Sequence, residues 1–369
     1  MKTSSPIPRI LLVLLPALLL FLAGCAYPTL PPTTPPTTPT TIPAPEALTI
    51  VTHDSFDISE EVLNRFHEDT GIEIKVLKSG DAGEMLNTLI LSKENPLGDV
   101  VYGIDNTFLS RALEADLFAP YDAPALADIP DDLELDPEHK MLPVDFGFVT
   151  LNYDIAWFEQ NDLDPPDDIA DLTDPAYKGL TVVENPASSS PGLAFLLTTV
   201  GRFGTEGDYT YLDYWRDLRA NDVQVTEGWS DAYWGVFTVG SGGEGDRPIV
   251  VSYATSPVAE VYFNELESPP TASVNTPGNS FKQVEFVGIL ARSPHAQAAR
   301  RLIDFLLSPT FQEDIPLHMF VYPANSKADM GDLFRRWAEV PTEPVSVSPE
   351  DIARHREEWI EAWTDVVLR

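Results

Sequence analysis

From residue 48 onward, short apolar strands alternate with amphipathic helices, and this alternation limits the possible folds more than any other feature of the chain. The first strand, "LTIVTHDSF", is followed by "SEEVLNRFHEDTG", in which Ser59 is placed to cap a helix and Gly71 to end it. A second strand, a second helix and the buried strand "DVVYGID" follow. Strand–helix alternation predicts an α/β fold with a mostly parallel sheet, whose ligands collect at the carboxyl ends of the strands.

Two longer extended segments, at 142–154 and 281–293, enclose a block with its own strands and helices. This order predicts two α/β lobes that are joined by two extended crossings. The first lobe is then discontinuous, from residues 47–147 plus 287–369, and the second lobe covers 148–286.

The N-terminus has the order of a signal peptide. Basic Lys2 and Arg9 precede an apolar run that ends in "LAGC". A lone cysteine at this position resembles the bacterial lipoprotein box, which predicts a signal peptide over 1–24 and a lipid on Cys25. An ordinary signal peptide or an uncleaved anchor is the alternative. Residues 25–46 are rich in Pro and Thr and predict an extended stalk that holds an exported domain off a membrane, facing the periplasm or the cell exterior.

Composition excludes several classes of function. With 58 acidic and 23 basic residues, the chain has a formal net charge of -35, which argues against nucleic-acid binding and is compatible with a cationic ligand. Cys25 is the only cysteine, so the folded part has no thiol nucleophile and no disulfide. The six histidines show no close metal-ligand pair, and no "GxSxG" motif is present.

Eight segments in order carry a resemblance to a known family. They are "THDSF", "GIDNT", "PVDFGFVTLNYD", "SSSPGL", "EGWSDAYWG", "VSYATSPV", "SPTFQEDIP" and "FVYP". Over roughly residues 48–368 the chain resembles the thiamine-binding periplasmic proteins of ABC importers. The resemblance implies a two-lobed periplasmic-binding-protein-like fold of type II. It also implies a monomer that makes or breaks no bond, needs no cofactor, captures thiamine or a thiamine phosphate between its lobes, and delivers it to a membrane permease.

Aromatic residues are the first group of candidate ligand-binding residues. Trp229 and Tyr253 match the family's aromatic positions, and a cationic thiazolium ring is suited to aromatic faces. Tyr233 lies one helical turn after Trp229 and is predicted to join this wall. Trp234 is predicted to pack in the core. From "GWSDAYWG" alone, core packing is the alternative for all of these rings.

Polar residues at element ends form the second group. In "SSSPGL", Ser189, Ser190 and Gly192 begin a helix, whose free N–H groups bind anions, and the resemblance places Ser189 near the phosphate of a bound thiamine phosphate. A plain helix cap is the alternative. Asp105 and Asn106 follow a strand and are predicted to bind the aminopyrimidine or to offset the thiazolium charge, although they also suit a helix cap.

Three positions depart from the family's aromatic pattern, namely His53, Ala259 and Phe320. His53 and Phe320 are still predicted to contact the ligand, and Tyr322 keeps its matched place, with a core or hinge role as the alternative. These departures leave room for another ligand, such as an aminopyrimidine precursor or a polyamine. A ferric-iron receptor and a thiamine-degrading enzyme are further alternatives. Related iron receptors use paired tyrosines, and this chain has no Tyr-Tyr doublet; the enzyme uses a catalytic cysteine, and the folded part of this chain has none.

Overall fold

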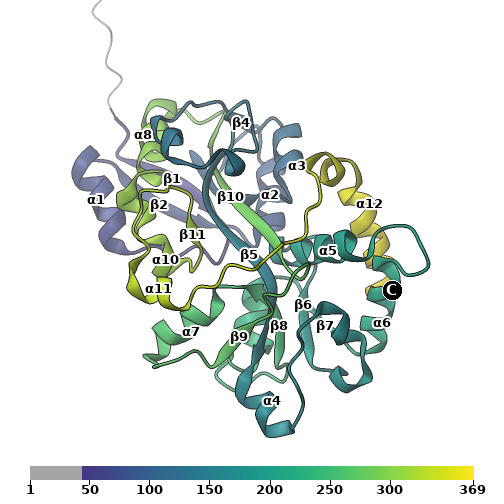
Figure 1. Ribbon diagram of the computed structural model, residues 1–369. Helices are drawn as coiled ribbons and strands as arrows, with labels where there is room; N and C mark the ends of the chain where they lie inside the picture. Colours follow the sequence, from purple (N-terminus) through teal and green to yellow (C-terminus); the bar gives the residue numbers. More distant parts are fainter. Residues whose placement is uncertain (1–43) are drawn as a thin grey trace, which may run out of the picture. The chain divides into compact units, whose positions relative to one another are not determined.

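The computed structural model describes residues 44–369 (Figure 1). The predicted signal peptide, Cys25 and most of the predicted stalk lie outside these residues. Within 44–369, no helix combines the length and the apolar character that a membrane crossing requires.

The strands form one sheet. They are β1 (Ala47–Thr52), β2 (Glu73–Lys78), β3 (Val100–Asp105), β4 (Phe118–Ala119), β5 (Leu142–Asp154), β6 (Thr181–Glu184), β7 (Gln224–Thr226), β8 (Ile249–Tyr253), β9 (Thr271–Ser273), β10 (Phe281–Leu290) and β11 (Tyr322–Pro323). The main order is β2-β1-β3-β10-β5-β8-β6-β7, with β4 beside β10 and with β9 and β11 beside β5.

Helices cover this sheet. The α-helices are α1 (Glu60–Thr70), α2 (Ala82–Leu91), α3 (Leu109–Glu114), α4 (Ile155–Asn161), α5 (Ser190–Phe203), α6 (Tyr211–Ala220), α7 (Ser256–Asn264), α8 (Ala296–Leu306), α9 (Pro309–Gln312), α10 (Ile315–His318), α11 (Gly331–Trp337) and α12 (Pro349–Val367). Short 3₁₀ turns are η1 (Pro124–Asp128), η2 (Asp131–Leu133), η3 (Ile169–Thr173) and η4 (Pro175–Tyr177), and η5 (Asp231–Val236) is a π-helical turn.

The topology confirms the predicted two-lobed α/β fold. β2, β1 and β3 are parallel in one half of the sheet, and β8, β6 and β7 are parallel in the other. Between them, the long strands β5 and β10 pair with each other in antiparallel register and form the two predicted extended crossings (Figure 1). The exact lobe boundaries stay a prediction. The last helix, α12, contacts both α3 and α6, and therefore packs on elements of both halves.

A further segment, residues 338–348, also passes between the halves. It links α11 to α12 and lies beside the start of β10, where the Val345 N–H donates to the Ser280 carbonyl at 2.7 Å. Figure 1 shows this yellow-green segment passing across β5. Within residues 44–369, three stretches of chain therefore join the two halves.

Local sequence accounts for the first helix as predicted. The Ser59 hydroxyl accepts a hydrogen bond from the Val62 N–H at 3.2 Å, which satisfies a free donor of the first turn. Gly71 ends α1 with a left-handed φ of 73°, a conformation that glycine adopts without a steric penalty. Phe66 is the buried residue of this helix and packs against Phe305 of α8.

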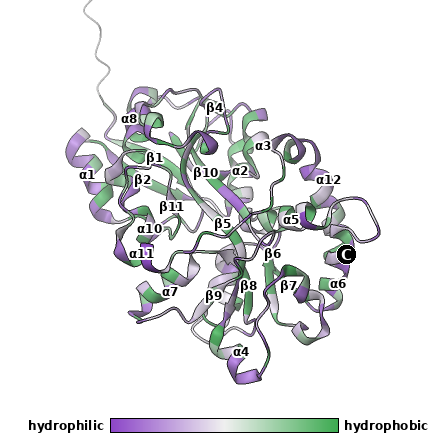
Figure 2. Cartoon of the chain, in the orientation of Figure 1, coloured by the Kyte–Doolittle hydropathy of each residue, from purple (hydrophilic) through white to green (hydrophobic). Residues whose placement is uncertain are grey.

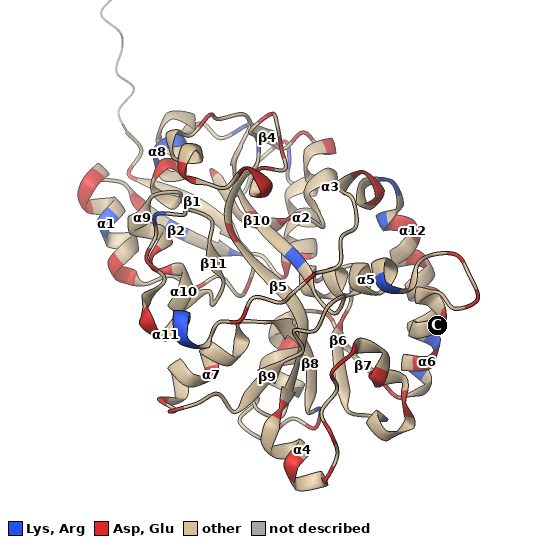
Figure 3. Cartoon of the chain, in the orientation of Figure 1, with Lys and Arg blue, Asp and Glu red and all other residues tan. Residues whose placement is uncertain are grey.

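The sheet is the apolar centre of the molecule. Hydrophobic colour runs along the central strands, while the helices carry polar residues on their outer faces (Figure 2). All six residues of β3 are buried, as is typical of a strand covered on both sides. Acidic residues are spread over the outer helices and loops, with few basic residues between them (Figure 3). This distribution is consistent with an acidic surface rather than one acidic binding patch.

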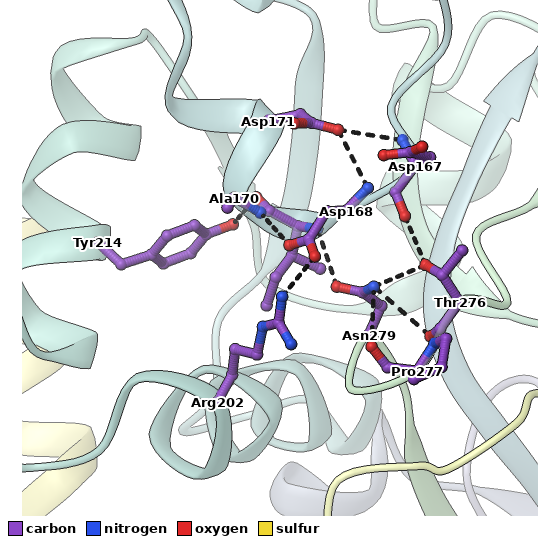
Figure 4. Close-up of polar contacts among 10 residues, drawn as sticks. Asp167, Asp168, Ala170, Asp171, Arg202, Tyr214, Thr276, Pro277 and Asn279 are labelled. Carbon is purple, nitrogen blue, oxygen red and sulfur yellow. Dashed lines mark hydrogen bonds and ion pairs between the residues drawn. The ribbon is translucent and has the colours of Figure 1, made fainter.

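Polar contacts fix the loop that carries η3 in the second half (Figure 4). The Asn279 side chain accepts from the Ile169 N–H at 3.0 Å and donates to Thr276, whose hydroxyl donates to the Asp167 carbonyl. Tyr214 of α6 donates to the Ile169 carbonyl at 3.0 Å. The loop between α4 and β6 is thereby tied to the chain that enters β10.

Candidate ligand-binding site

A cavity of about 260 Å³ opens where the carboxyl ends of strands from both halves meet. One side comes from the residues after β1, the start of α2 and β10, and the other side from the start of α5, the segment after β7 and helix α7. The lining residues are His53, Asp54, Ser55, Asp57, Asp81, Ser190, Pro191, Trp229, Ser230, Tyr233, Trp234, Tyr253, Ser256, Ala259, Phe263, Glu285, His318, Met319, Phe320 and Val321. This position is the one that an open α/β sheet favours for a ligand.

Trp229 forms an aromatic wall in this cavity. Its indole is half-buried and stacks on Tyr233, with ring centroids 5.0 Å apart and an interplanar angle of 23°. The indole N–H donates to the Ser252 hydroxyl at 2.9 Å, which fixes the ring orientation. Tyr253 meets the indole edge-on at 6.4 Å. The side of the indole that faces the cavity is therefore held in place before any ligand arrives.

Tyr233 forms the layer behind Trp229. It is 1% exposed, and its hydroxyl donates to Glu260 Oε1 at 2.8 Å. Burial and the nearby Glu260 charge raise the pKa of Tyr233 well above its ordinary value, so the phenol stays neutral. The ring therefore supports the wall by packing, and its polar end is already satisfied by protein.

The prediction that Trp234 packs in the core is wrong. Trp234 is 44% exposed and lines the cavity. The reason is the π-helical turn η5, in which the Phe237 N–H donates to the Ala232 carbonyl five residues back. This wider turn changes the direction in which its side chains project, and such turns are frequent at functional sites. Sequence spacing alone does not reveal a π-helical turn.

Trp234, Phe263 and Phe320 form an aromatic rim at the mouth of the cavity. Phe263 is 56% exposed, and its ring lies 6.4 Å from Trp234 and 5.3 Å from Phe320. Ala259, where the resemblance implies a tyrosine, also lines the cavity and adds little bulk. The rim therefore supplies apolar surface to a cavity in which Ala259 replaces the aromatic side chain that the resemblance implies.

Acidic side chains dominate the polar lining. Asp54, Asp57, Asp81 and Glu285 line the cavity, whereas the lining contains no lysine or arginine. Asp81 also bridges the two sides, because its Oδ2 accepts from the Trp229 N–H at 3.1 Å and its Oδ1 from the Ala82 N–H at 2.7 Å. A cation is the ligand charge that this lining favours.

Three carboxylates lie in a row across the sheet beneath the cavity. Glu285 on β10 faces Asp105 on β3 and Asp145 on β5. Tyr102 donates to Asp145 Oδ2 at 2.5 Å. Burial and the charge of Glu285 raise the pKa of Asp145 well above its ordinary value, which favours the neutral form of this carboxyl. Of the three acids, Glu285 is the one that lines the cavity.

The chain is similar to known solute-binding proteins in sequence and in fold. The family model described as "Bacterial extracellular solute-binding protein" matches residues 95–341. The chain belongs to this family of extracellular solute-binding proteins. The thiamine-binding periplasmic protein of Escherichia coli strain K12 is 30% identical over 333 residues, which span 88% of this chain and 95% of that protein. The corresponding protein of Brucella suis is 27% identical and matches 88% of this chain and 93% of its own length.

Solved structures place the solute-binding protein in the same fold. A periplasmic thiamin binding protein superposes with a TM-score of 0.75 and 27% identity, covering 89% of this chain and 99% of that one. Iron-bound HitA of Pseudomonas aeruginosa has a TM-score of 0.69 at 20% identity, covering 87% of this chain and 99% of that one, and is similar in fold. Within residues 44–369, no group of three or more His, Cys, Asp or Glu side chains is arranged to hold a metal ion.

Six predicted site residues lie at the cavity and five lie elsewhere. His53, Ser190, Trp229, Tyr233, Tyr253 and Phe320 line it. Asp105, Asn106, Ser189, Gly192 and Tyr322 do not, and protein groups already engage them. Whether any of the eleven binds a ligand stays a prediction.

Asp105 and Asn106 form hydrogen bonds that join the end of β3 to β10. Asp105 Oδ1 accepts from the Thr107 N–H and hydroxyl at 2.6 Å each, and burial raises the pKa of Asp105 to about 6. Asp105 Oδ2 accepts from Gln283, whose amide also donates to Ser190 in the cavity lining. Asn106 binds the β10 backbone through both side-chain atoms. Asp105 therefore influences the cavity through Gln283.

The other three residues have structural contacts. Ser189 caps α5 through a 3.5 Å bond from the Gly192 N–H, as the alternative reading expects. A Cβ at Gly192 would lie 2.6 Å from the Glu184 carbonyl oxygen, so glycine permits the close approach of α5 to β6. Tyr322 is buried and stacks on Phe146 at 5.2 Å, which matches its alternative core role.

Sequence reasoning missed several lining residues, including Asp81, Ser256, Phe263, Glu285 and His318. For Glu285 a signal was present, because an acid within the apolar strand "FKQVEFVGIL" is unusual and buried charges require a partner. Phe263 and His318 lie on short helices without a distinguishing pattern. Only the packing of the two halves brings them to the cavity.

Proposed function

We propose that this protein is the thiamine receptor of an ABC importer, which captures thiamine between its two lobes and delivers it to a membrane permease. The observation that carries the proposal is the fixed indole wall of Trp229 in a cavity whose charged lining is acidic. A thiazolium gains about 0.5–2 kcal/mol from an aromatic face, and carboxylates offset its charge. The relatives named for thiamine binding support the same ligand.

We place unphosphorylated thiamine ahead of its phosphates. Each added phosphate brings negative charge towards Asp54, Asp81 and Glu285, and the lining has no lysine or arginine to neutralise it. The start of α5, at Ser190 and Pro191, favours an anion, but the imidazole of His53 faces Glu285, which neutralises the imidazole when it is protonated. Thiamine phosphates are therefore weaker ligands in this proposal.

The proposal includes export and anchoring. Lipid on Cys25, a stalk over 25–46, anchoring to the cell membrane with the protein facing the periplasm or the cell exterior, and action as a monomer remain predictions. So do the lobe boundaries at 47–147 plus 287–369 and 148–286. Labelling cells with a fatty-acid analogue tests the anchor: wild-type protein takes up label, and Cys25→Ser does not. Label on both proteins or on neither contradicts it.

Calorimetric titration of the purified full-length protein with thiamine tests the ligand. We expect one-to-one binding with a Kd of micromolar or lower, and weaker binding of thiamine mono- and diphosphate in the same buffer. The free aminopyrimidine and spermidine are the comparison ligands. No heat with thiamine, together with saturable binding of either comparison ligand, would overturn the proposal and assign the cavity to that other ligand. Unchanged thiamine after incubation is the result expected of a receptor without enzymatic activity.

A further inference from the structure

Two buried polar atoms face each other at the cavity floor without a hydrogen-bond partner among the described residues. His53 Nε2 and Glu285 Oε2 lie 3.5 Å apart, beyond a good hydrogen bond, and their residues are 7% and 8% exposed. Both line the cavity. Buried polar groups are rarely left unpaired in a folded protein, so this gap indicates a place where a proton or a ligand is accommodated.

We propose that His53 and Glu285 form a proton-operated site for the ligand's positive charge, in which Glu285 is the counter-charge of the bound cation and a proton on His53 competes with that cation. The proposal rests on the proposed function, because it takes thiamine as the cationic ligand. In the empty protein, an imidazolium at His53 neutralises Glu285. When the thiazolium arrives, the proton leaves, because two cations beside one carboxylate repel each other.

The surroundings of His53 hold its ring in this position. Gly103 has a φ of 95°, and a Cβ there would lie 2.1 Å from His53 Cδ2, so the imidazole occupies the space that glycine leaves free. Tyr102 meets the ring edge-on at 6.4 Å. Burial lowers the pKa of His53, but the charge of Glu285, the polar contact of the imidazole with that carboxylate and the charge of Asp81 together outweigh burial and the charge of Lys78. The pKa of His53 therefore lies above its ordinary value of 6.5.

The groups that face Glu285 keep it available as a counter-charge. Burial and the Glu285 charge raise the pKa of Asp145 on β5 well above its ordinary value, which favours its neutral form, and Tyr102 donates to Asp145. Asp105 on β3 is already bonded to Thr107 and Gln283. No lysine or arginine lines the cavity, so His53 is the group within the lining placed to neutralise Glu285.

The proposal predicts that thiamine binding depends on pH with a defined sign. Below the His53 pKa, each pH unit downward adds protonated competitor, so the affinity falls about tenfold per unit, and binding releases up to one proton. Above that pKa the affinity is constant. We expect Glu285→Gln to bind thiamine about 10- to 100-fold more weakly at pH 8, because the cation loses its charge partner.

The test is calorimetry with thiamine from pH 5.5 to 8.5, in two buffers of different ionisation enthalpy that count the protons released. Wild-type protein and His53→Gln are compared, and proton uptake by the ligand itself is common to both. His318→Gln is the matched control, because His318 lines the same cavity but lies 3.4 Å from Asp57 and not beside Glu285. We expect the proton release to persist in His318→Gln and to vanish in His53→Gln.

Each alternative outcome is distinct. Thiamine binding that does not change with pH in the wild-type protein overturns the proton-operated site and leaves the thiamine receptor standing. Proton release that persists in His53→Gln also overturns it and assigns the proton to another group, such as Asp105. An absence of thiamine binding at every pH overturns the proposed function and this proposal with it.

Discussion

The replacement of Trp229 by alanine is the most direct perturbation of the candidate site. Its indole presents one face to the cavity, while Tyr233 supports the other face at 5.0 Å and Ser252 accepts the indole N–H. Loss of the face removes a cation–π contact of about 0.5–2 kcal/mol. It also removes about 40–80 Å² of apolar contact with the ligand, which is worth about 1–2 kcal/mol. Binding should weaken by roughly 1.5–4 kcal/mol, or about 10- to 1,000-fold.

The fold should survive this replacement. Trp229 is only half-buried, so the loss of packing and of one hydrogen bond should lower the free energy of unfolding by about 1–3 kcal/mol, below the cost of emptying a fully buried site. Trp229→Phe keeps an aromatic face but loses the bond to Ser252, and we expect an intermediate affinity. Trp157→Ala is the matched control, because Trp157 is partly buried on α4 and does not line the cavity.

The assay is calorimetric titration with thiamine, with urea unfolding of each variant as the stability measurement. Trp157→Ala should lose stability comparable to that lost by Trp229→Ala but bind thiamine as the wild-type protein does. If Trp229→Ala, still folded, bound thiamine with unchanged affinity, the aromatic-wall reasoning would be refuted. A loss of binding in Trp157→Ala equal to that in Trp229→Ala would assign the effect to stability.

Three further predictions concern stability. Burial raises the pKa of Asp105 from 3.8 to about 6. Asp105 therefore contributes up to about 3 kcal/mol to the free energy of unfolding at low pH, and this contribution is lost as pH rises through about 6. The free energy of unfolding of Asp105→Asn, measured with urea, should change less between pH 4 and 7 than that of the wild type. Gly103→Ala should destabilise the fold by about 1–3 kcal/mol and weaken thiamine binding, because its Cβ would strike His53; unchanged unfolding and titration curves would contradict this. Ser59→Ala should cost about 1 kcal/mol through the lost cap of α1, with thiamine affinity unchanged, as thermal unfolding and calorimetry would check.

The fold was predictable because its signals are local. Ser59 and Gly71 mark the ends of α1 through caps that involve only nearby residues. The two long extended runs became β5 and β10, since a covered strand reads as a nearly continuous apolar segment. The antiparallel pairing of these strands and the third connection at 338–348 depend on contacts between distant residues, and no short pattern records them.

The candidate site was only partly predictable for the same physical reason. Trp229 and Tyr253 were found because their segments resemble family motifs. Asp105 and Asn106 lie at the predicted strand end, but their side chains are used by the protein itself. Trp234 was placed wrongly because a π-helical turn shifts side-chain direction without a sequence signature.

The two halves of the cavity have different physical tasks in the proposed receptor. The wall side, around Trp229, is ordered before binding, because Tyr233, Ser252 and Asp81 already hold the indole and its backbone. Little ordering entropy is then lost when a ring is bound. The floor side, at His53 and Glu285, is left incompletely paired, so it gains most from the arrival of a charge. In this proposal the shape of the ligand is recognised by side chains whose contacts are already formed, and its charge by side chains that still lack a hydrogen-bond partner. Mutations on the wall should change affinity at every pH, whereas mutations on the floor should change how affinity depends on pH.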